Sequence, residues 1–187
     1  MPKQWTIPGT VLQMNREDAK YIEERFSSMF LAGGMVLSQV ASITGLEPYT
    51  IQNWVKRGFL TPPQRKRYSL EQLCRIININ MLKSALPMER ICGLLSYVNG
   101  QLDNEADDII DDSHLYFMFV RLAAQARTWD DPSDAEKIIA QTLTDYVEPV
   151  PGARDRIAKA LRVMLIGWLA ARMKQVAESL LDECEKA

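Results

Sequence analysis

The sequence predicts a mostly α-helical protein with two parts, a small basic head followed by an all-α helical bundle tail. Apolar residues recur at the spacing of a helix, rather than the alternating spacing of a strand, over most of the 187 residues. Charge is also divided along the chain, because 37–75 has a net charge of +4 and 101–187 has a net charge of −7. A basic segment in a chain with a net charge of −2 indicates either a polyanionic partner or a solvated surface patch.

Composition favours a soluble protein of the cytoplasm. The three cysteines, Cys74, Cys92 and Cys184, are far apart and odd in number, which argues against a disulfide framework. The chain has a single histidine, His114, and no CxxC pair, so we expect no metal site. No signal-peptide pattern opens the sequence, and the longest apolar run, 163–171, is about half of the length that spans a bilayer. We therefore expect no membrane association.

No catalytic pattern is visible in the sequence. It has no GxSxG, GxGxxG or GxxxxGK motif, and no Ser or Cys stands near a plausible histidine partner. Paired carboxylates occur in the acidic stretch alone, where nothing indicates the burial that would tune their pKa values. We expect a protein that is not an enzyme, with no catalytic residues and no cofactor.

An N-terminal helical segment, 1–36, precedes the head. The stretch NREDAKYIEERFSSMFLAGG has a good helix start at Asn15 and ends at Gly33 and Gly34. This pattern predicts one amphipathic helix that leads into the head.

The head begins with a helix-turn-helix pattern. Two short helices are predicted, from 38 to 44 and from 48 to 56, joined by a turn that contains Gly45. Gly45 allows the positive φ that such a turn requires, and Pro48 fits the first turn of the second helix. Ala41 is small at the place where the second helix must cross closely.

The second of these helices has two different faces. Ile51 and Trp54 lie one turn apart and would fill the angle between the two helices. The opposite face carries side chains that can contact base edges or phosphates: Tyr49, Thr50, Gln52, Asn53 and Lys56. The pattern predicts a recognition helix for double-stranded DNA.

A basic stretch, LTPPQRKRYSLEQL, follows the second helix. From 37 to about 97 the chain resembles the winged helix-turn-helix head of MerR-type bacterial regulators, on the segments KRGFLTP, YSLEQLCRIININML and LPMERICGLLSYV. The resemblance implies a DNA-binding domain over 37–100 with a small basic wing. It implies four wing residues at the DNA: Arg65, Lys66, Arg67 and Tyr68. The whole chain is similar to a group of uncharacterised bacterial proteins that join such a head to a helical tail.

The resemblance also implies a role for each wing residue. The three cations would grip the phosphate backbone, Tyr68 would anchor the wing and Ser69 would cap the next helix. This wing is shorter than is usual in the family, is stiffened by Pro62 and Pro63, and has no Gly at its tip. The recognition helix also lacks the early Arg of many relatives, so the base preference of the family is not carried over.

An acidic stretch, 101–112, separates the head from the tail. It has neither the central Gly nor the closing Glu of an EF-hand loop. Two interpretations are open: a solvated linker, or a segment that lies over the basic head and competes with DNA.

The tail, 113–187, is predicted to be helical throughout. Its first helix is almost wholly apolar and therefore unsuited to an exposed position. Its last helix is apolar on more than one face, so its own chain or a second copy must cover it. The three predicted helices are 113–129, 133–147 and 153–184.

We expect a homodimer joined through the C-terminal helices, because one small head makes few contacts with DNA. Trp168 is the expected seam of that dimer. The competing arrangement is a monomer in which the N-terminal helix around 21–30 folds back over the tail. The tail could also hold the site of a small-molecule or protein effector.

Two functions fit these patterns. The first is a sequence-specific, DNA-binding transcriptional regulator of the MerR-like type. The second is a non-regulatory architectural or protein-interaction module that retains a DNA-binding head. A base preference in DNA binding would separate them.

Overall fold

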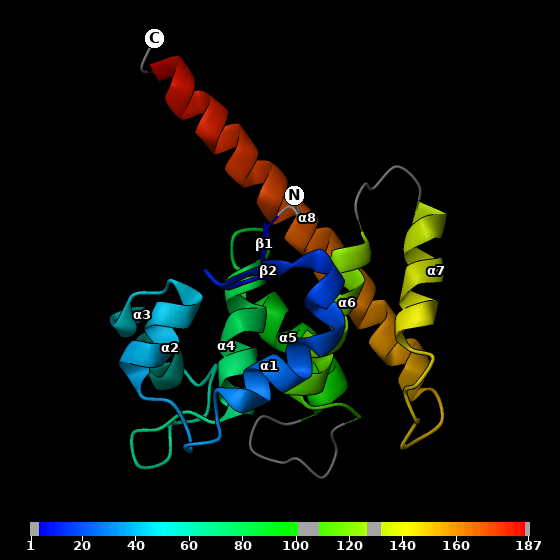
Figure 1. The fold of residues 1–187 in the computed structure, drawn as a ribbon, viewed down its shortest axis with the longest axis horizontal. Helices are drawn as coiled ribbons and strands as arrows, with labels where there is room; N and C mark the ends of the chain where they lie inside the picture. The colour runs from blue at the N-terminus through cyan, green and yellow to red at the C-terminus, as the bar shows by residue number, and fades with distance from the viewer. Residues whose placement is uncertain (1–3, 101–108, 127–131, 186–187) are drawn as a thin grey trace.

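A computed structural model of the chain describes residues 4–100, 109–126 and 132–185 (Figure 1). Within these ranges the chain is mostly helical, as predicted, with one small two-stranded sheet. The α-helices are α1 (Ile22–Ser28), α2 (Leu37–Thr44), α3 (Pro48–Lys56), α4 (Leu70–Leu82), α5 (Met88–Asn99), α6 (Asp112–Gln125), α7 (Pro132–Thr142) and α8 (Ala153–Glu185).

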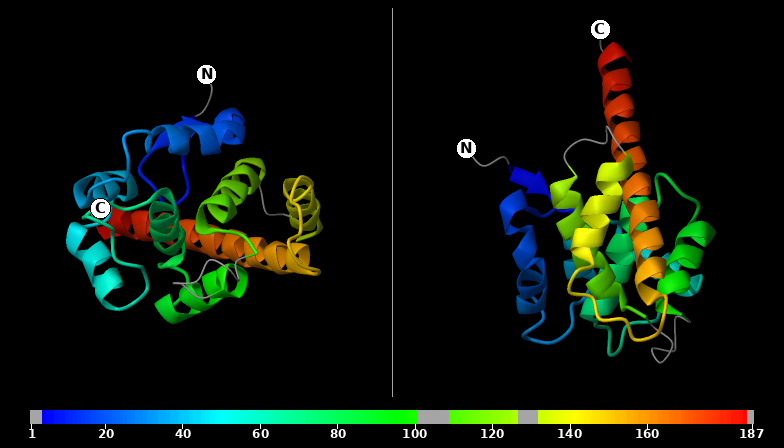
Figure 2. Two further views of the ribbon diagram at one scale, coloured as in Figure 1. Left: turned by 90° about the horizontal axis from the view of Figure 1, so that it is seen from below. Right: turned by 90° about the vertical axis from the view of Figure 1, so that its right-hand side faces the viewer.

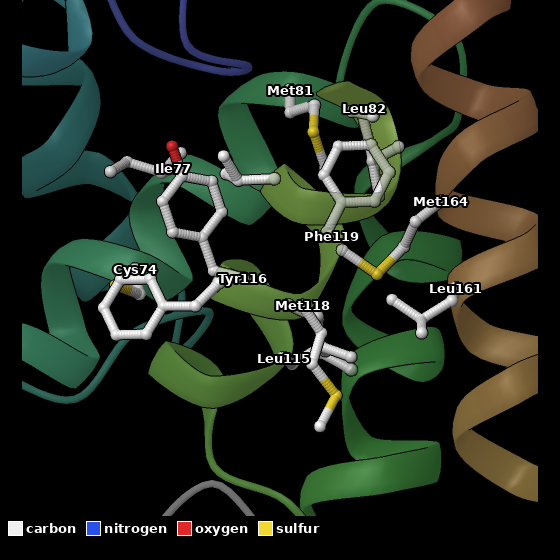
Figure 3. Close-up of a cluster of buried hydrophobic side chains, with 14 of the residues drawn as sticks. Cys74, Ile77, Met81, Leu82, Leu115, Tyr116, Met118, Phe119, Leu161 and Met164 are labelled. Carbon is white, nitrogen blue, oxygen red and sulfur yellow. The ribbon is translucent and has the colours of Figure 1, made fainter. Parts of the chain in front are cut away.

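The centre of the fold is α6, which contacts both α4 and α8. Figure 3 shows Tyr116 of α6 beside Cys74 of α4, while Leu161 and Met164 of α8 point toward α6 from the other side. Tyr116 and Phe119 are fully buried. The prediction that this helix is too apolar for an exposed position is therefore confirmed.

The N-terminal segment begins with two strands that the sequence patterns did not indicate. The strands β1 (Gln4–Thr6) and β2 (Gln13–Asn15) pair antiparallel, with Trp5 opposite Met14. Both of these side chains are buried. The pairing with β1 holds the backbone at Asn15 in an extended conformation, so the contact between distant residues overrides the local helical pattern.

The predicted single helix from Asn15 to Gly33 and Gly34 is therefore wrong. A 3-10 helix, η1 (Arg16–Tyr21), is followed by α1, which ends at Ser28. Asn15 does precede the first helical turn, where its side chain donates a hydrogen bond to Asp18 (3.1 Å).

Residues 7–12 contact three helices that are far apart in the sequence, α2, α4 and α6. The Tyr116 hydroxyl of α6 donates to the carbonyl of Pro8 (2.9 Å). Asn80 of α4 donates to the carbonyl of Gly9 (3.0 Å) and to the carbonyl of the last residue of α2 (2.9 Å). We call residues 7–12 the threading segment, because it joins α2, α4 and α6.

The helix α8 has two unlike parts. From Ala153 to Ala171 it carries buried side chains and packs against α4, α5, α6 and α7. All residues from 172 to 185 are exposed. Figures 1 and 2 show this last part projecting beyond the other helices. We call residues 172–185 the α8 overhang.

Trp168 lies in the packed part of α8 and not on an open surface. Its side chain is 6% exposed, and its ring meets Phe119 edge-to-face with the centroids 5.9 Å apart. The expectation that Trp168 forms a dimer seam is therefore wrong, since a Glu there would disrupt the core of one chain. The helix α1 was the alternative cover that we considered for the tail. It packs against α6, which is the first helix of the predicted tail.

The end of the predicted acidic linker is part of the folded body. Residues 101–108, which hold most of the acidic stretch, lie outside the described residues. Ile109 and Ile110 are buried, and the Asp111 carboxylate caps α6 by accepting two backbone N–H bonds. The end of the stretch therefore belongs to the fold, and one hydrophobic core joins the predicted head and tail.

None of the helices in the described part of the chain is long and apolar enough to cross a membrane. In those same ranges, no group of three His, Cys, Asp or Glu side chains could hold a metal ion. Cys74, Cys92 and Cys184 are free thiols, and burial raises the pKa of Cys74 well above its usual value.

Candidate nucleic-acid interface

The helices α2 and α3 meet at a tight turn. α2 ends at Gly45, which has a φ of 69° and donates its N–H to the Ala41 carbonyl (2.8 Å). A Cβ at this position would also lie 2.8 Å from a methyl group of Val11 in the threading segment. Both the backbone conformation and the close packing therefore favour glycine. Pro48 then occupies the first turn of α3.

The α3 helix buries one face and exposes the other. Ile51 and Trp54 are buried, as predicted, together with Val40 of α2. The opposite face points to solvent, where Tyr49 is 70% exposed. The predicted recognition residues are all exposed or partly exposed: Tyr49, Thr50, Gln52, Asn53 and Lys56.

The basic stretch forms a two-residue turn, and we call residues 64–67 the basic hairpin. Gln64 and Arg67 pair across it, with the Arg67 N–H donating to the Gln64 carbonyl (2.8 Å). Between them Arg65 and Lys66 have φ values of 49° and 62°, which are typical of a type I′ turn. Side chains other than Gly cost about 1–2 kcal/mol each in this region, so such turns usually contain Asn and Gly. Two exposed cations thus occupy strained positions at the tip.

Residues 61 and 62 lead into the basic hairpin, and we call them its first arm. This arm is attached to α4. The Gln72 amide donates to the carbonyls of Thr61 and Pro62 and to the Thr61 hydroxyl, at 2.9–3.2 Å. Gln72 also forms a reciprocal capping box with Ser69, which confirms the predicted helix cap. The arm is therefore held by the same side chain that stabilises the start of α4.

The second arm is attached to the segment before α2. The backbone of Tyr68 exchanges two hydrogen bonds with Met35 (2.8 and 2.9 Å), and the Arg67 guanidinium donates to the Gly34 carbonyl (2.6 Å). The Tyr68 side chain is only 3% exposed. Its assignment as a residue at the DNA surface is therefore corrected, because its ring lies in the core and anchors the hairpin.

Arg75, which we counted in the basic segment, is not a surface cation. It is buried, and its Nη1 lies 3.0 Å from Asp112 Oδ2 at the start of α6. Its Nε donates to the Phe59 carbonyl (3.0 Å), just before the arm that leads to the hairpin. Burial raises the pKa of the Asp112 carboxyl, and the neighbouring guanidinium opposes that effect. The pair connects the predicted head to the predicted tail.

Arg57 is also engaged in packing. Its guanidinium stacks over the Phe59 ring at 4.6 Å and lies 3.5 Å from a carboxylate oxygen of Glu89. The exposed cations of this region are therefore Lys56, the cations of the basic hairpin, and Arg57, whose charge is offset by Glu89. Figure 1 shows α2 and α3 on the side of the molecule opposite α7, with the chain between α3 and α4 on the same side.

Two supports of this surface were missed by sequence reasoning. The first is the threading segment, in which Gly9 accepts a hydrogen bond from Asn80 and Val11 packs against Gly45, so that it braces the end of α2. No local pattern marks it, because its partners lie far away in the chain. The second is the set of hydrogen bonds that Gln72 donates to Thr61 and Pro62. The Ser-x-x-Gln spacing of Ser69 and Gln72 is typical of a capping box and could have indicated the fixed position of the Gln72 side chain.

The chain belongs to a family described as a domain of unknown function, DUF1836, whose family model matches residues 7–119. This stretch starts at the threading segment and ends within α6, so it includes α3, the basic hairpin and the pair of Arg75 and Asp112. The uncharacterized protein YkrK of Bacillus subtilis (strain 168) is 29% identical over 116 residues. That match covers 60% of this chain and about half of YkrK. No solved structure matches this chain.

Proposed function

We propose that this protein is a sequence-specific, DNA-binding transcriptional regulator of the MerR-like type, with a winged helix-turn-helix head. The observation that carries the proposal is a pair of exposed features on consecutive elements. One is the polar face of α3, and the other is a braced hairpin with Arg65 and Lys66 at its tip. The first suits base edges in the major groove, and the second suits phosphates.

Within α3, the side chains divide by chemistry. Asn53 can form a bidentate pair with adenine, and Thr50 can contact the methyl group of thymine. Gln52 and Tyr49 can donate to and accept from base edges or phosphates, while Lys56 at the end of the helix suits a phosphate. These residues face away from the buried Ile51 and Trp54, so DNA contact would not disturb the core.

The strain at the hairpin tip supports a functional role for its cations. Arg65 and Lys66 gain nothing for folding from their positive φ values, which Asn or Gly would adopt at lower cost. Strained residues of this kind cluster at functional sites, where the rest of the fold holds them in place. Here the hydrogen bonds of Gln72 and of the Tyr68 backbone hold the hairpin in place.

The test is selection of binding sites from random DNA duplexes with the full chain, followed by titration at several salt concentrations. We expect the selection to converge on one sequence. Lys56 and the three hairpin cations can neutralise about four phosphates, so log affinity should fall with log salt at a slope of about −3 to −4. The same slope without sequence preference would favour the architectural module, and no binding at low salt would exclude both.

A further inference from the structure

One face of α8 carries apolar side chains that the described part of the chain leaves exposed. Met173, Val176 and Leu180 are 69%, 54% and 56% exposed, and Ile166 is exposed as well. Together with the partly buried Leu169 they follow a spacing of three and four residues, which is the spacing of a coiled-coil seam. We call these five residues the outer stripe.

The outer stripe lies on a different side of α8 from the side chains that pack into the core. At about 100° per residue, it is opposite the face on which Trp168 and Met164 pack into the core. Beyond Ala171 the body-side face continues with polar residues, among them Gln175 and Asp182. The helix therefore has one face that packs against the body and another that is exposed within the described part of the chain.

A groove of about 630 Å³ lies between α8 and the body, and every residue of the outer stripe except Leu180 lines it, together with Arg16 and Ala126. Most of its lining is apolar, but it also includes the guanidinium groups of Arg16 and Arg172. Both groups are held over aromatic rings, Arg16 over Trp5 and Arg172 over Trp168, each at 4.9 Å. The groove thus combines apolar surface with fixed positive charge, which suits an amphipathic partner with acidic groups.

Charge is segregated along the α8 overhang. Its first turn carries Arg172 and Lys174, whereas its later turns are acidic. The acidic side chains are Glu178, Asp182, Glu183 and Glu185. Two overhangs packed in parallel would place like charges at the same height, but an antiparallel pair would place opposite charges there.

We propose that a second copy of this chain covers the outer stripe, with the two α8 overhangs packed antiparallel. The acidic end of each overhang then reaches the groove of the other copy, where Arg16 and Arg172 lie. In this arrangement the outer stripes of the two copies pack against each other, and the acidic end of each overhang lies beside the basic end of the other. This dimer does not depend on the proposed function, because it uses a different surface and forms without DNA.

The apolar spacing also indicates the register of the pair. When Met173 lies beside Leu180 of the second copy, Leu169 lies beside Cys184 of the second copy. The two-fold axis then passes close to Ala177. In this register the two Cys184 residues are about 15 residues apart along the helix axis, which is about 22 Å. That separation is far too great for a disulfide.

The first experiment is sedimentation equilibrium of the full chain at tens of micromolar without DNA. We expect twice the 21.3 kDa mass of one chain. Val176→Glu should weaken association by about 100-fold or more, because it places a charge in the seam. Gln175→Glu adds the same charge on the other face of the overhang and should remain a dimer. Circular dichroism of both variants should match the parent, since both positions are exposed. A monomeric parent, or a Val176→Glu dimer, would overturn the proposal.

The second experiment tests the orientation through oxidative cross-linking. In the antiparallel register Ala177→Cys, made together with Cys184→Ser, should form a disulfide with its own copy. The parent, which keeps Cys184, should form none between its overhangs. A parallel in-register pair would also allow the Ala177→Cys disulfide, because residues 177 and 184 are one heptad apart and share a position in the repeat, but it would in addition cross-link the parent through Cys184. Efficient cross-linking of the parent through Cys184 would therefore overturn the antiparallel arrangement.

Discussion

Arg75 and the cations at the tip of the basic hairpin come from the same short basic segment, but the fold uses them differently. Arg75 is buried against Asp112, with a second bond to a backbone carbonyl. Arg65 and Lys66 stand exposed on a strained turn, and they contribute nothing to the core. One cation joins two parts of the molecule, whereas the others face outward to solvent.

The difference teaches that a charge count cannot separate buried structural cations from exposed ones. The sequence between residues 37 and 75 gives every Lys and Arg equal weight. Burial separates them, because a buried guanidinium requires a fixed counter-charge and an exposed one does not. The counter-charge of Arg75 lies 37 residues away, in a stretch that we expected to be largely a linker. Substitutions on each side of this comparison should therefore have separate effects on folding and on DNA binding.

The largest effect is expected at the buried pair. Asp112→Ala leaves Arg75 buried without a counter-charge, which should lower the free energy of unfolding by about 3–5 kcal/mol. Urea denaturation followed by circular dichroism measures this change. The matched control is the double variant Arg75→Met with Asp112→Leu, which removes both charges and should recover much of the loss. A loss below about 1 kcal/mol in the single variant would mean that the pair is not structural.

The second effect belongs to the basic hairpin. Replacing Arg65, Lys66 and Arg67 together by Ala removes about three phosphate contacts, so DNA affinity at physiological salt should fall roughly 100-fold for all sequences alike. The free energy of unfolding should change by about 0.5 kcal/mol or less, apart from the loss of the Arg67 bond to Gly34. Fluorescence anisotropy with labelled duplexes at several salt concentrations measures the affinity.

A control for the hairpin variant keeps its change in net charge but moves it elsewhere. Exposed lysines far along the chain from the hairpin are suitable for Ala substitution: Lys20, Lys137 and Lys159. This control should bind DNA almost as the parent does. Equal losses in the two triple variants would show that net charge, rather than the hairpin, governs binding.

A smaller effect is expected on α3, where specificity rather than overall affinity should change. Asn53→Ala should reduce discrimination at one base pair by about 1–3 kcal/mol and leave the fold intact. Repeating the site selection with this variant measures the change. Ser42→Ala, an exposed substitution on α2, should leave the selected sequence unchanged. A selected site identical in every position for Asn53→Ala would rule out base contact by that side chain.

The smallest effect is expected from relieving the backbone strain at Lys66, which should change the free energy of unfolding. Lys66→Asn places a residue that tolerates positive φ at the turn, so the free energy of unfolding should rise by about 0.5 kcal/mol. Lys66→Ala removes the same charge without relieving the backbone and should not stabilise the protein. Both variants should bind DNA more weakly, because both lose a phosphate contact. Equal stability of the two in urea denaturation would show that the turn conformation carries no measurable strain.

The sequence predicted those elements whose signals are local. Gly45, Pro48 and the spacing of Ile51 and Trp54 lie within a few residues of one another, so the helix pair and its buried face could be identified. The tail helices were also predicted, since long periodic patterns are reliable. The strands β1 and β2 and the partner of Arg75 were not, because each depends on a contact between distant parts of the chain. For the candidate site, the surface, the Tyr68 anchor and the Ser69 cap could be predicted, but the threading segment that braces α2 could not.

The long-range contacts of the threading segment indicate when this segment docks during folding. The bond between Pro8 and Tyr116 closes a loop of 108 residues, and the bond from Asn80 to Gly9 closes one of 71. Closing such long loops early is entropically unfavourable, so we expect the threading segment to dock late in folding. On the ribosome, residues 7–12 are made before α6 and can dock only after α6 has emerged. A fragment that begins at residue 37 would never receive them, and the turn at Gly45 would lose the Val11 packing that braces it.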